Sequence, residues 1–233
     1  MAAEEPTNDP SYWVRWHESY GDPDSALSQR LRVVQAAVRR SLDDAPAGPL
    51  RIVSMCAGQG RDVIDVVAEH PRRSDIEALL VELDPGLVAF ARAHAAEAGL
   101  GAAVRVVEGD ASRCRAYAEA VPAQVVLVCG VFGNISPADI AATVRALPGF
   151  CTPGASVIWT RHRLPPDATP VIRQLFAEAG FDEVSFTPLP DPFVQTIGHH
   201  RLRLDPPGPG DPGAFDPERT LFEFVGHGGG GLR

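Results

Sequence analysis

The sequence predicts a doubly wound α/β fold built on a mostly parallel sheet, and three observations support this prediction. From Arg51 to Ala179, short apolar segments alternate with stretches of helical periodicity, as in strands joined by crossover helices. The apolar segments are nearly continuous, as expected for parallel strands covered on both faces. Residues 51–62, RIVSMCAGQGRD, give a strand, a glycine turn and the start of a helix in direct succession.

Each of five expected strands is followed by an expected helix. The strands are Ile52–Cys56, Ala78–Leu83, Val104–Val107, Val125–Cys129 and Ser156–Thr160, and the helices are Arg61–Glu69, Leu87–Ala98, Ser112–Ala120, Pro137–Leu147 and Thr169–Ala179. Two further strands, Val184–Thr187 and Thr196–Leu204, follow with no helix between them. A hairpin that closes a parallel sheet must contribute one antiparallel strand.

Segments of different composition flank this pattern on both sides. Residues 1–48 hold an aromatic cluster, Tyr12, Trp13, Trp16, His17 and Tyr20, and then a capped helix that ends near Leu42. We expect them to form a helical lid on a domain at 49–205 that folds without it; the alternative is packing on the outside of that domain. Residues 206–233 form an extension rich in proline and glycine, in which Leu221–Val225 is expected to dock.

Composition excludes several classes of function. The net charge is −9 and no basic stripe occurs, so nucleic acid is a poor candidate partner. All 21 basic residues are arginine, and without lysine neither Schiff-base chemistry nor a P-loop is available. We expect a cytoplasmic protein with no membrane partner, because the N-terminus is acidic, no apolar run could span a membrane, and the four cysteines show no CxxC spacing.

The expected edge of the sheet carries groups suited to an adenosine. Gly58 and Gly60 allow the backbone to approach a ligand closely. Glu82, at the end of the second strand, can accept two hydrogen bonds from a ribose diol, and Asp110, after the third strand, can accept from an adenine amino group. Val63 stands where a dinucleotide fingerprint has its third glycine, so a ligand without a pyrophosphate is favoured.

Because of these features, the segment 50–205 resembles the class I S-adenosylmethionine (SAM)-dependent methyltransferases. The resemblance rests on Cys56–Gly60, Val81–Pro85, Gly109–Ala111 and the final hairpin. It implies a seven-stranded sheet in the order 3-2-1-4-5-7-6 with strand 7 antiparallel, and SAM as the cofactor. The cofactor-binding residues that it implies are Cys56, Ala57, Gly58 and Gly60 for the methionine part, Glu82 and Leu83 for the ribose, Asp110 and Ala111 for the adenine, and Gly130 after strand 4.

Two departures from the family pattern concern the methionine end. Ser54 stands where an acidic residue is frequent, and Cys56 where a glycine is frequent. The amino group of the cofactor would then be held by Asp62, by Tyr20 or by a backbone carbonyl.

Histidines near the expected edge are candidates for a general base, since an imidazole titrates near neutral pH. The candidates are His17 in the aromatic cluster, His162 after strand 5, and His199 with its neighbour His200 at the start of the antiparallel strand. No metal is predicted, because Trp159–His162, at the end of strand 5, contains no aspartate. Arg161 and Arg163 are there instead, in a surface role or to hold an anionic substrate.

The sequence therefore predicts an enzyme that methylates a small molecule, as a monomer or a homodimer. Two alternatives remain open at this point. One is a nicotinamide-dependent oxidoreductase on a similar fold, and the other is a non-catalytic module that binds SAM or a partner.

Overall fold

The computed structural model describes residues 16–203 and 213–225, so Tyr12, Trp13 and the glycine-rich tail lie outside the described residues. The strands are β1 (Leu50–Met55), β2 (Ile76–Glu82), β3 (Val104–Glu108), β4 (Ala123–Val128), β5 (Cys151–His162), β6 (Phe181–Pro188) and β7 (Gln195–Leu202). The α-helices are α2 (Ala26–Asp43), α3 (Arg61–Glu69), α4 (Pro85–Glu97), α5 (Pro137–Ala146) and α6 (Thr169–Glu178), with short 3₁₀ turns at Ser19–Gly21, Arg73–Asp75, Cys114–Tyr117 and Leu147–Phe150.

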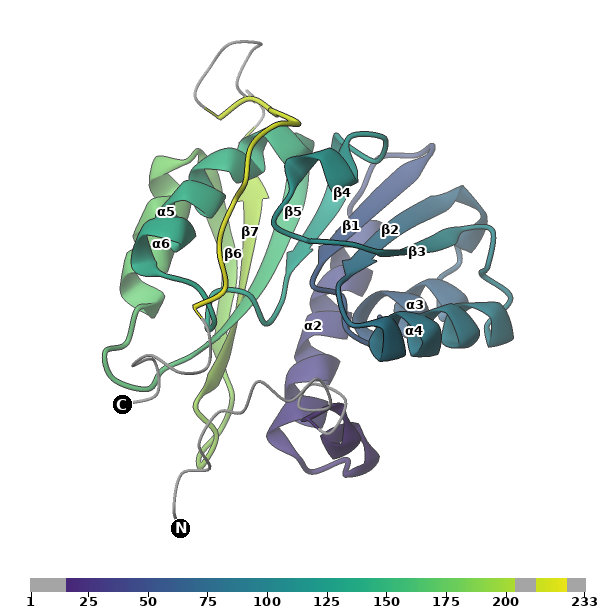
Figure 1. Ribbon diagram of the computed structural model, residues 1–233, viewed down its shortest axis with the longest axis horizontal. Coiled ribbons are helices and arrows are strands. Elements are labelled where there is room, and N and C mark those ends of the chain that lie inside the picture. Colours follow the sequence, from purple (N-terminus) through teal and green to yellow (C-terminus); the bar gives the residue numbers. More distant parts are fainter. Residues whose placement is uncertain (1–15, 204–212, 226–233) are drawn as a thin grey trace.

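The seven strands form one sheet in the order β3-β2-β1-β4-β5-β7-β6 (Figure 1). The neighbours from β3 to β5 pair in parallel, whereas β7 pairs antiparallel with both β5 and β6. Both the doubly wound fold and the predicted strand order are confirmed. The carboxyl ends of the parallel strands consequently meet along one edge of the sheet.

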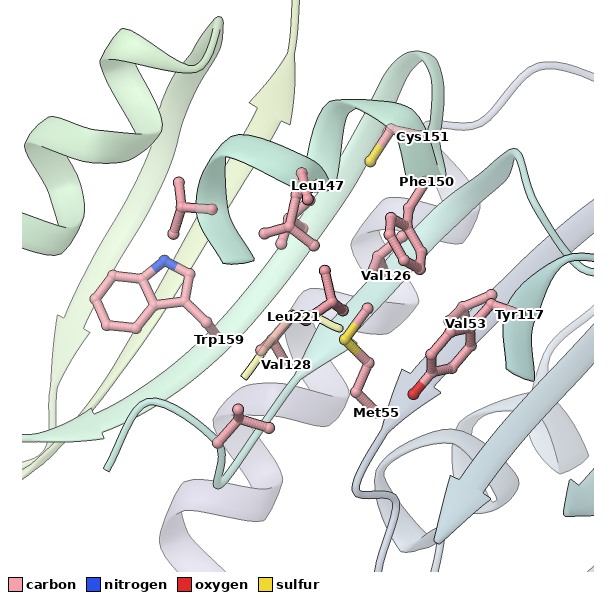
Figure 2. Packing of buried hydrophobic residues seen from close by; sticks show 14 of the residues in the cluster. Val53, Met55, Tyr117, Val126, Val128, Leu147, Phe150, Cys151, Trp159 and Leu221 are labelled. Atoms are coloured by element: carbon pink, nitrogen blue, oxygen red, sulfur yellow. The ribbon is translucent and has the colours of Figure 1, made fainter. Parts of the chain in front are cut away.

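Each face of the sheet carries its own apolar core. On one face, α2, α3 and α4 cover a cluster that includes Ile52, Leu80 and Ile158. On the other face, α5 and α6 cover a cluster that includes Val53, Met55 and Trp159 (Figure 2). Alternate residues of a strand therefore point into different cores, which explains the nearly continuous apolar runs in the sequence.

Helix α2 is part of this covering layer. Ser25 caps it, since the Ser25 hydroxyl accepts from the N–H of Ser28 at 3.1 Å. Val34, Val38 and Leu42 are all buried, in the same cluster as Ile52 of β1. The expectation that residues 49–205 would fold without this helix is therefore not supported by its packing, and a lid role stays a prediction only for the residues before α2.

The prediction of a helix at Ser112–Ala120 is wrong, because the chain there forms only the 3₁₀ turn Cys114–Tyr117. The C-terminal segment 213–225 takes its place beside this turn: the N–H of Leu221 donates to Ser112 O at 2.8 Å, and the N–H of Cys114 donates to Arg219 O at 3.1 Å. Leu221 and Phe222 are buried in the same core as Met55 (Figure 2). The apolar segment thus docks as expected, and it covers sheet surface that a helix would otherwise cover.

Candidate cofactor and substrate site

The glycine turn after β1 is held in a left-handed backbone. Cys56, Gly58 and Gly60 have φ values of 51°, 55° and 68°. The N–H of Ala57 donates to Val81 O at 3.0 Å, which ties the turn to β2. The φ of Gly60 favours glycine, and a Cβ there would lie 2.7 Å from Leu80 Cδ2, so that side chain would also have to move.

Glu82 connects the end of β2 to this turn. Its Oε2 accepts from the N–H of Gly58 at 2.8 Å, and its Oε1 accepts from the N–H groups of Leu83 and Asp84 at 2.8 and 2.9 Å. Only 9% of Glu82 is exposed. A carboxylate offers about four lone-pair sites, so three bonds leave acceptor capacity for a ligand hydroxyl.

The residues expected at the adenine lie beside Glu82 on the same edge. Leu83 exposes 65% of its surface, and an apolar side chain there suits the face of a base. Asp110 Oδ1 accepts from the N–H and the hydroxyl of Ser112 at 2.9 and 2.7 Å, and its Oδ2 lies 3.3 Å from Arg113 Nε. Although burial acts to raise the pKa of Asp110, the bonds from Ser112 and Arg113 outweigh it and lower that pKa. Asp110 is thus an ionised acceptor next to the buried Ala111.

The methionine side of the turn contains a carboxylate with spare capacity. Asp62 Oδ1 is buried, and it has no hydrogen-bond partner within the described residues. Burial raises the pKa of Asp62 to about 6, while the positive charge of Arg30 acts to lower it. Arg30 also hydrogen-bonds the Tyr20 side chain, so Tyr20, Arg30 and Asp62 form one group beside the glycine turn. An unsatisfied buried acceptor is what an ammonium ligand requires, and this arrangement fits the amino group of SAM.

We predict that Asp62→Asn stabilises the fold in a pH-dependent manner. The pKa of Asp62 is raised from 3.8 to about 6 in the folded protein, so the folded state binds a proton more tightly than the unfolded state does. The free energy of unfolding therefore falls as pH rises through that interval. The substitution should raise the free energy of unfolding by up to about 3 kcal/mol above pH 6 and by nothing below about pH 4, and it should weaken SAM binding. Urea unfolding at both pH values measures this, with the exposed Asp24→Asn as the control; an equal change at both pH values would contradict it.

His17 lies directly on the glycine turn. A Cβ on Gly58 would lie 2.5 Å from His17 Nε2, and His17 is only 8% exposed. The His17 and Tyr20 rings are 5.6 Å apart, and the Arg61 guanidinium lies 5.3 Å from the centroid of the Tyr20 ring. Residues 16–21 therefore cover the carboxyl end of β1 (Figure 1).

The loop after β4 faces the same edge. The N–H of Gly130 donates to Thr160 Oγ1 at 2.8 Å, and Asn134 Nδ2 donates to Gly130 O at 2.6 Å. A Cβ on Gly130 would meet no atom within 4 Å, so this backbone borders open space. Thr160 and Asn134 therefore hold the loop in place. The sequence alone did not predict this role for either residue, because Thr160 lies in an apolar strand and nothing there indicates its contact with Gly130.

His162 lies at the end of β5, beside this loop. Its Nδ1 accepts from the N–H of Leu164 at 3.2 Å. Burial lowers the pKa of His162, and the neighbouring Arg161 lowers it further. A neutral imidazole whose Nδ1 accepts must carry its proton on Nε2, so His162 offers a donor to the edge rather than a base.

His199 and His200 do not lie at the edge, and the expectation that they open β7 is wrong. The strand begins at Gln195, and His199 and His200 lie opposite Ile158 and Val157 in the middle of the sheet. His199 is 1% exposed, and its Nε2 lies 2.9 Å from Ser156 Oγ and 3.3 Å from Ser41 Oγ. His200 Nδ1 accepts from Trp159 Nε1 at 3.1 Å. Burial lowers the pKa of each to about 4, so both are neutral core residues that join the covering helices to the sheet.

Several other features bear on the class of site. Across residues 16–203 and 213–225, no three His, Cys, Asp or Glu side chains gather as a metal ion would require. In the same part of the chain, none of the helices combines the length and apolar character of a membrane span. The four cysteines are free thiols, and burial raises the pKa of Cys56 and Cys129 well above the ordinary range.

Comparison with known proteins decides the family. A family model described as "Putative methyltransferase" matches residues 27–182, which is more than half of the chain. The chain belongs to this methyltransferase family. The prediction of a class I SAM-dependent methyltransferase is thereby confirmed, and SAM is the cofactor that the family and the fold imply. The assignment does not favour the nicotinamide-dependent alternative.

Solved structures share the fold at low sequence identity. An O-methyltransferase family protein from Burkholderia thailandensis is 17% identical, with a TM-score of 0.61 over 83% of this chain and 61% of that one. Magnesium protoporphyrin IX methyltransferase from Synechocystis PCC 6803, solved with bound SAM, is 15% identical, with a TM-score of 0.62 over 82% of this chain and 90% of that one.

A curated relative is longer than the region that it shares with this chain. The "Uncharacterized protein YnbC" of Escherichia coli K12 is 27% identical over 138 residues, which are 58% of this chain and 23% of YnbC. The match therefore spans less than a quarter of YnbC, and the Burkholderia match spans about three fifths of that protein.

Proposed function

We propose that this methyltransferase transfers the methyl group of SAM to a small molecule bound at the carboxyl edge of β1, β4 and β5. The observation that carries the proposal is the bond from the Gly58 N–H to Glu82 Oε2. It fixes the cofactor turn against the carboxylate that the family resemblance assigns to the ribose. Binding energy can then be used to position a reactant, rather than to organise the loop.

The cofactor contacts follow from the residues on this edge. Glu82 would accept from the ribose hydroxyls, with Leu83 on the base and Asp110 with Ala111 at its amino group. The backbone of Cys56, Ala57, Gly58 and Gly60 would pass along the methionine part, whose amino group would bind Asp62 with support from Tyr20. Gly130 would line the remaining side, where the structure leaves open space.

A small-molecule acceptor is favoured by the cover on the site. Residues 16–21 lie over the glycine turn, and an open hollow beside them is lined by Trp16, Ser19, Arg30 and Gln195 among others. The net charge of −9 does not favour the phosphate backbone of nucleic acid.

Different side chains would carry out the other steps of methyl transfer. Bound SAM supplies a methyl group that is already activated on a sulfonium. His17, at the turn, is the candidate base for an acceptor that must lose a proton. His162 can donate from Nε2 to orient the acceptor. The residues before α2 would exclude water from the edge, so the reactants stay aligned.

The proposal is tested by incubating the full chain with SAM that carries a tritium-labelled methyl group and with a cell extract. The extract is then separated into small molecules, nucleic acid and protein. We expect label in the small molecules. Label in nucleic acid or protein would overturn the substrate class, and binding of SAM with no transfer to any fraction would favour the non-catalytic alternative.

A further inference from the structure

Two arginines at the end of β5 lack the partners that other half-buried arginines have. Arg161 and Arg163 are each partly buried, and the Nε of each is buried without a hydrogen-bond partner. Among the described residues, neither guanidinium forms an ion pair. Arg72, by contrast, donates to the carbonyls of Leu42, Ala45, Pro46 and Gly48, and Arg201, whose Nε is likewise unpaired, has Asp44 at 2.7 Å.

No ion pair joins the carboxylate of Asp167 to either arginine. Asp167 acts on Arg161 electrostatically, but its Oδ1 caps the following helix by accepting from the N–H and hydroxyl of Thr169 at 2.9 and 2.8 Å. Burial lowers the pKa of Arg161, which indicates that its charge is partly removed from water. A desolvated cation without a counterion costs free energy, and a bound anion would recover it.

Both arginines lie at the carboxyl end of β5, next to a loop that borders the proposed methyl-transfer site. Arg161 Nη1 donates to Phe132 O, in the loop that runs from Gly130 to Asn134. The N–H of Arg163 donates to Val194 O at 2.7 Å, which continues the antiparallel pairing of β5 with β7. Arg163 follows the last residue of β5, and residues two apart on extended backbone share a face, so the two side chains leave the backbone on the same face of the sheet.

Resting on the proposed function, we propose that Arg161 and Arg163 bind an oxyanion of the methyl acceptor, which is a small molecule that carries a carboxylate or a phosphate. Guanidinium groups bind either oxyanion through paired N–H donors. Gln195 pairs with His162 across the strands, so it lies on the opposite face of the sheet from the two arginines and is not part of this subsite. The subsite therefore recognises the charged end of the acceptor.

The test titrates benzoate, inorganic phosphate and neutral benzamide into the full chain saturated with S-adenosylhomocysteine, by calorimetry. We expect benzoate or phosphate to bind and benzamide not to bind. Arg163→Gln should lower the affinity for the anion about tenfold or more, since it removes a charged donor. Arg145→Gln, which removes the same charge from the exposed face of α5, should leave the affinity unchanged.

Arg163 decides the test, because its side chain makes no hydrogen bond to another described residue, whereas Arg161→Gln also removes the contact with Phe132. Equal affinity in the wild type, Arg163→Gln and Arg145→Gln would overturn the proposal, as would no anion binding to protein that holds S-adenosylhomocysteine. Failure of S-adenosylhomocysteine itself to bind would instead contradict the proposed function. The preferred anion distinguishes a carboxylic acid from a phosphate ester.

Discussion

Replacing Glu82 by alanine should reduce the affinity for SAM by about a hundredfold or more. The carboxylate would no longer accept from the ribose, and hydrogen bonds to charged groups contribute about 1.5–3 kcal/mol each. The substitution also leaves the N–H groups of Gly58, Leu83 and Asp84 without their acceptor. The turn would lose its connection to β2, so both the contact and its preorganisation disappear.

A neighbouring glutamate supplies the control for Glu82→Ala. Glu108 lies opposite Glu82 at the end of β3 and is exposed, and within the described residues it makes no side-chain hydrogen bond to the glycine turn. Calorimetry should therefore give unchanged SAM binding for Glu108→Ala. Glu82→Gln should fall between the two, because an amide keeps one acceptor but presents N–H donors to the backbone N–H groups. Equal SAM affinity of Glu82→Ala and the wild type would contradict the assignment of the ribose site.

Two N-terminal truncations should behave differently. A chain that starts at Asp22 keeps Ser25 and all of α2, so it should fold, while it loses His17 and Tyr20 over the glycine turn. A chain that starts at Ala45 lacks α2 and exposes its side of the sheet. Burying one aliphatic side chain contributes about 1.5–3 kcal/mol, so losing Val34, Val38 and Leu42 removes much of a typical domain stability of about 5–15 kcal/mol.

Thermal unfolding and SAM titration of the two truncated chains check this. The chain from Asp22 should melt cooperatively and bind SAM more weakly, and the chain from Ala45 should show no cooperative transition. If the chain from Asp22 binds SAM as tightly as the full chain does, residues 16–21 are not a cover for the cofactor. If the chain from Ala45 folds, α2 is not required for folding, and the burial of Val34, Val38 and Leu42 stabilises the domain less than stated above.

The parts of the site that sequence predicted are those set by local patterns. The glycine turn follows an apolar strand directly, and Glu82 ends the next strand, so the topology alone brings them to one edge. Strand order came from the family resemblance, because hydrophobic periodicity does not say which strands are neighbours. Asp62 was a candidate from sequence, because Ser54 stands where the family often has an acidic residue and another carboxylate was needed for the amino group. That Asp62 Oδ1 has no hydrogen-bond partner among the described residues is seen only in the structure.

The parts that sequence missed depend on distant segments. The helix expected at 112–120 gave way to a turn because residues 219–221 supply its hydrogen bonds, and they lie about a hundred positions away. The start of β7 was predicted to within one residue, since Thr196 was expected and Gln195 is observed. His199 was nevertheless misplaced, because a residue four positions along an extended strand lies about 13 Å from its start. Arg30 reaches Tyr20 and Asp62 from a helix that looked like an accessory segment.

The most direct measurement is a calorimetric titration of the wild-type chain with SAM and, separately, with NADH. A turn held by Glu82, with Val63 in place of a third glycine, predicts saturable binding of SAM with one site per chain and no binding of NADH. Binding of NADH without binding of SAM would contradict the account, because the edge of the sheet would then hold a dinucleotide rather than a methyl donor.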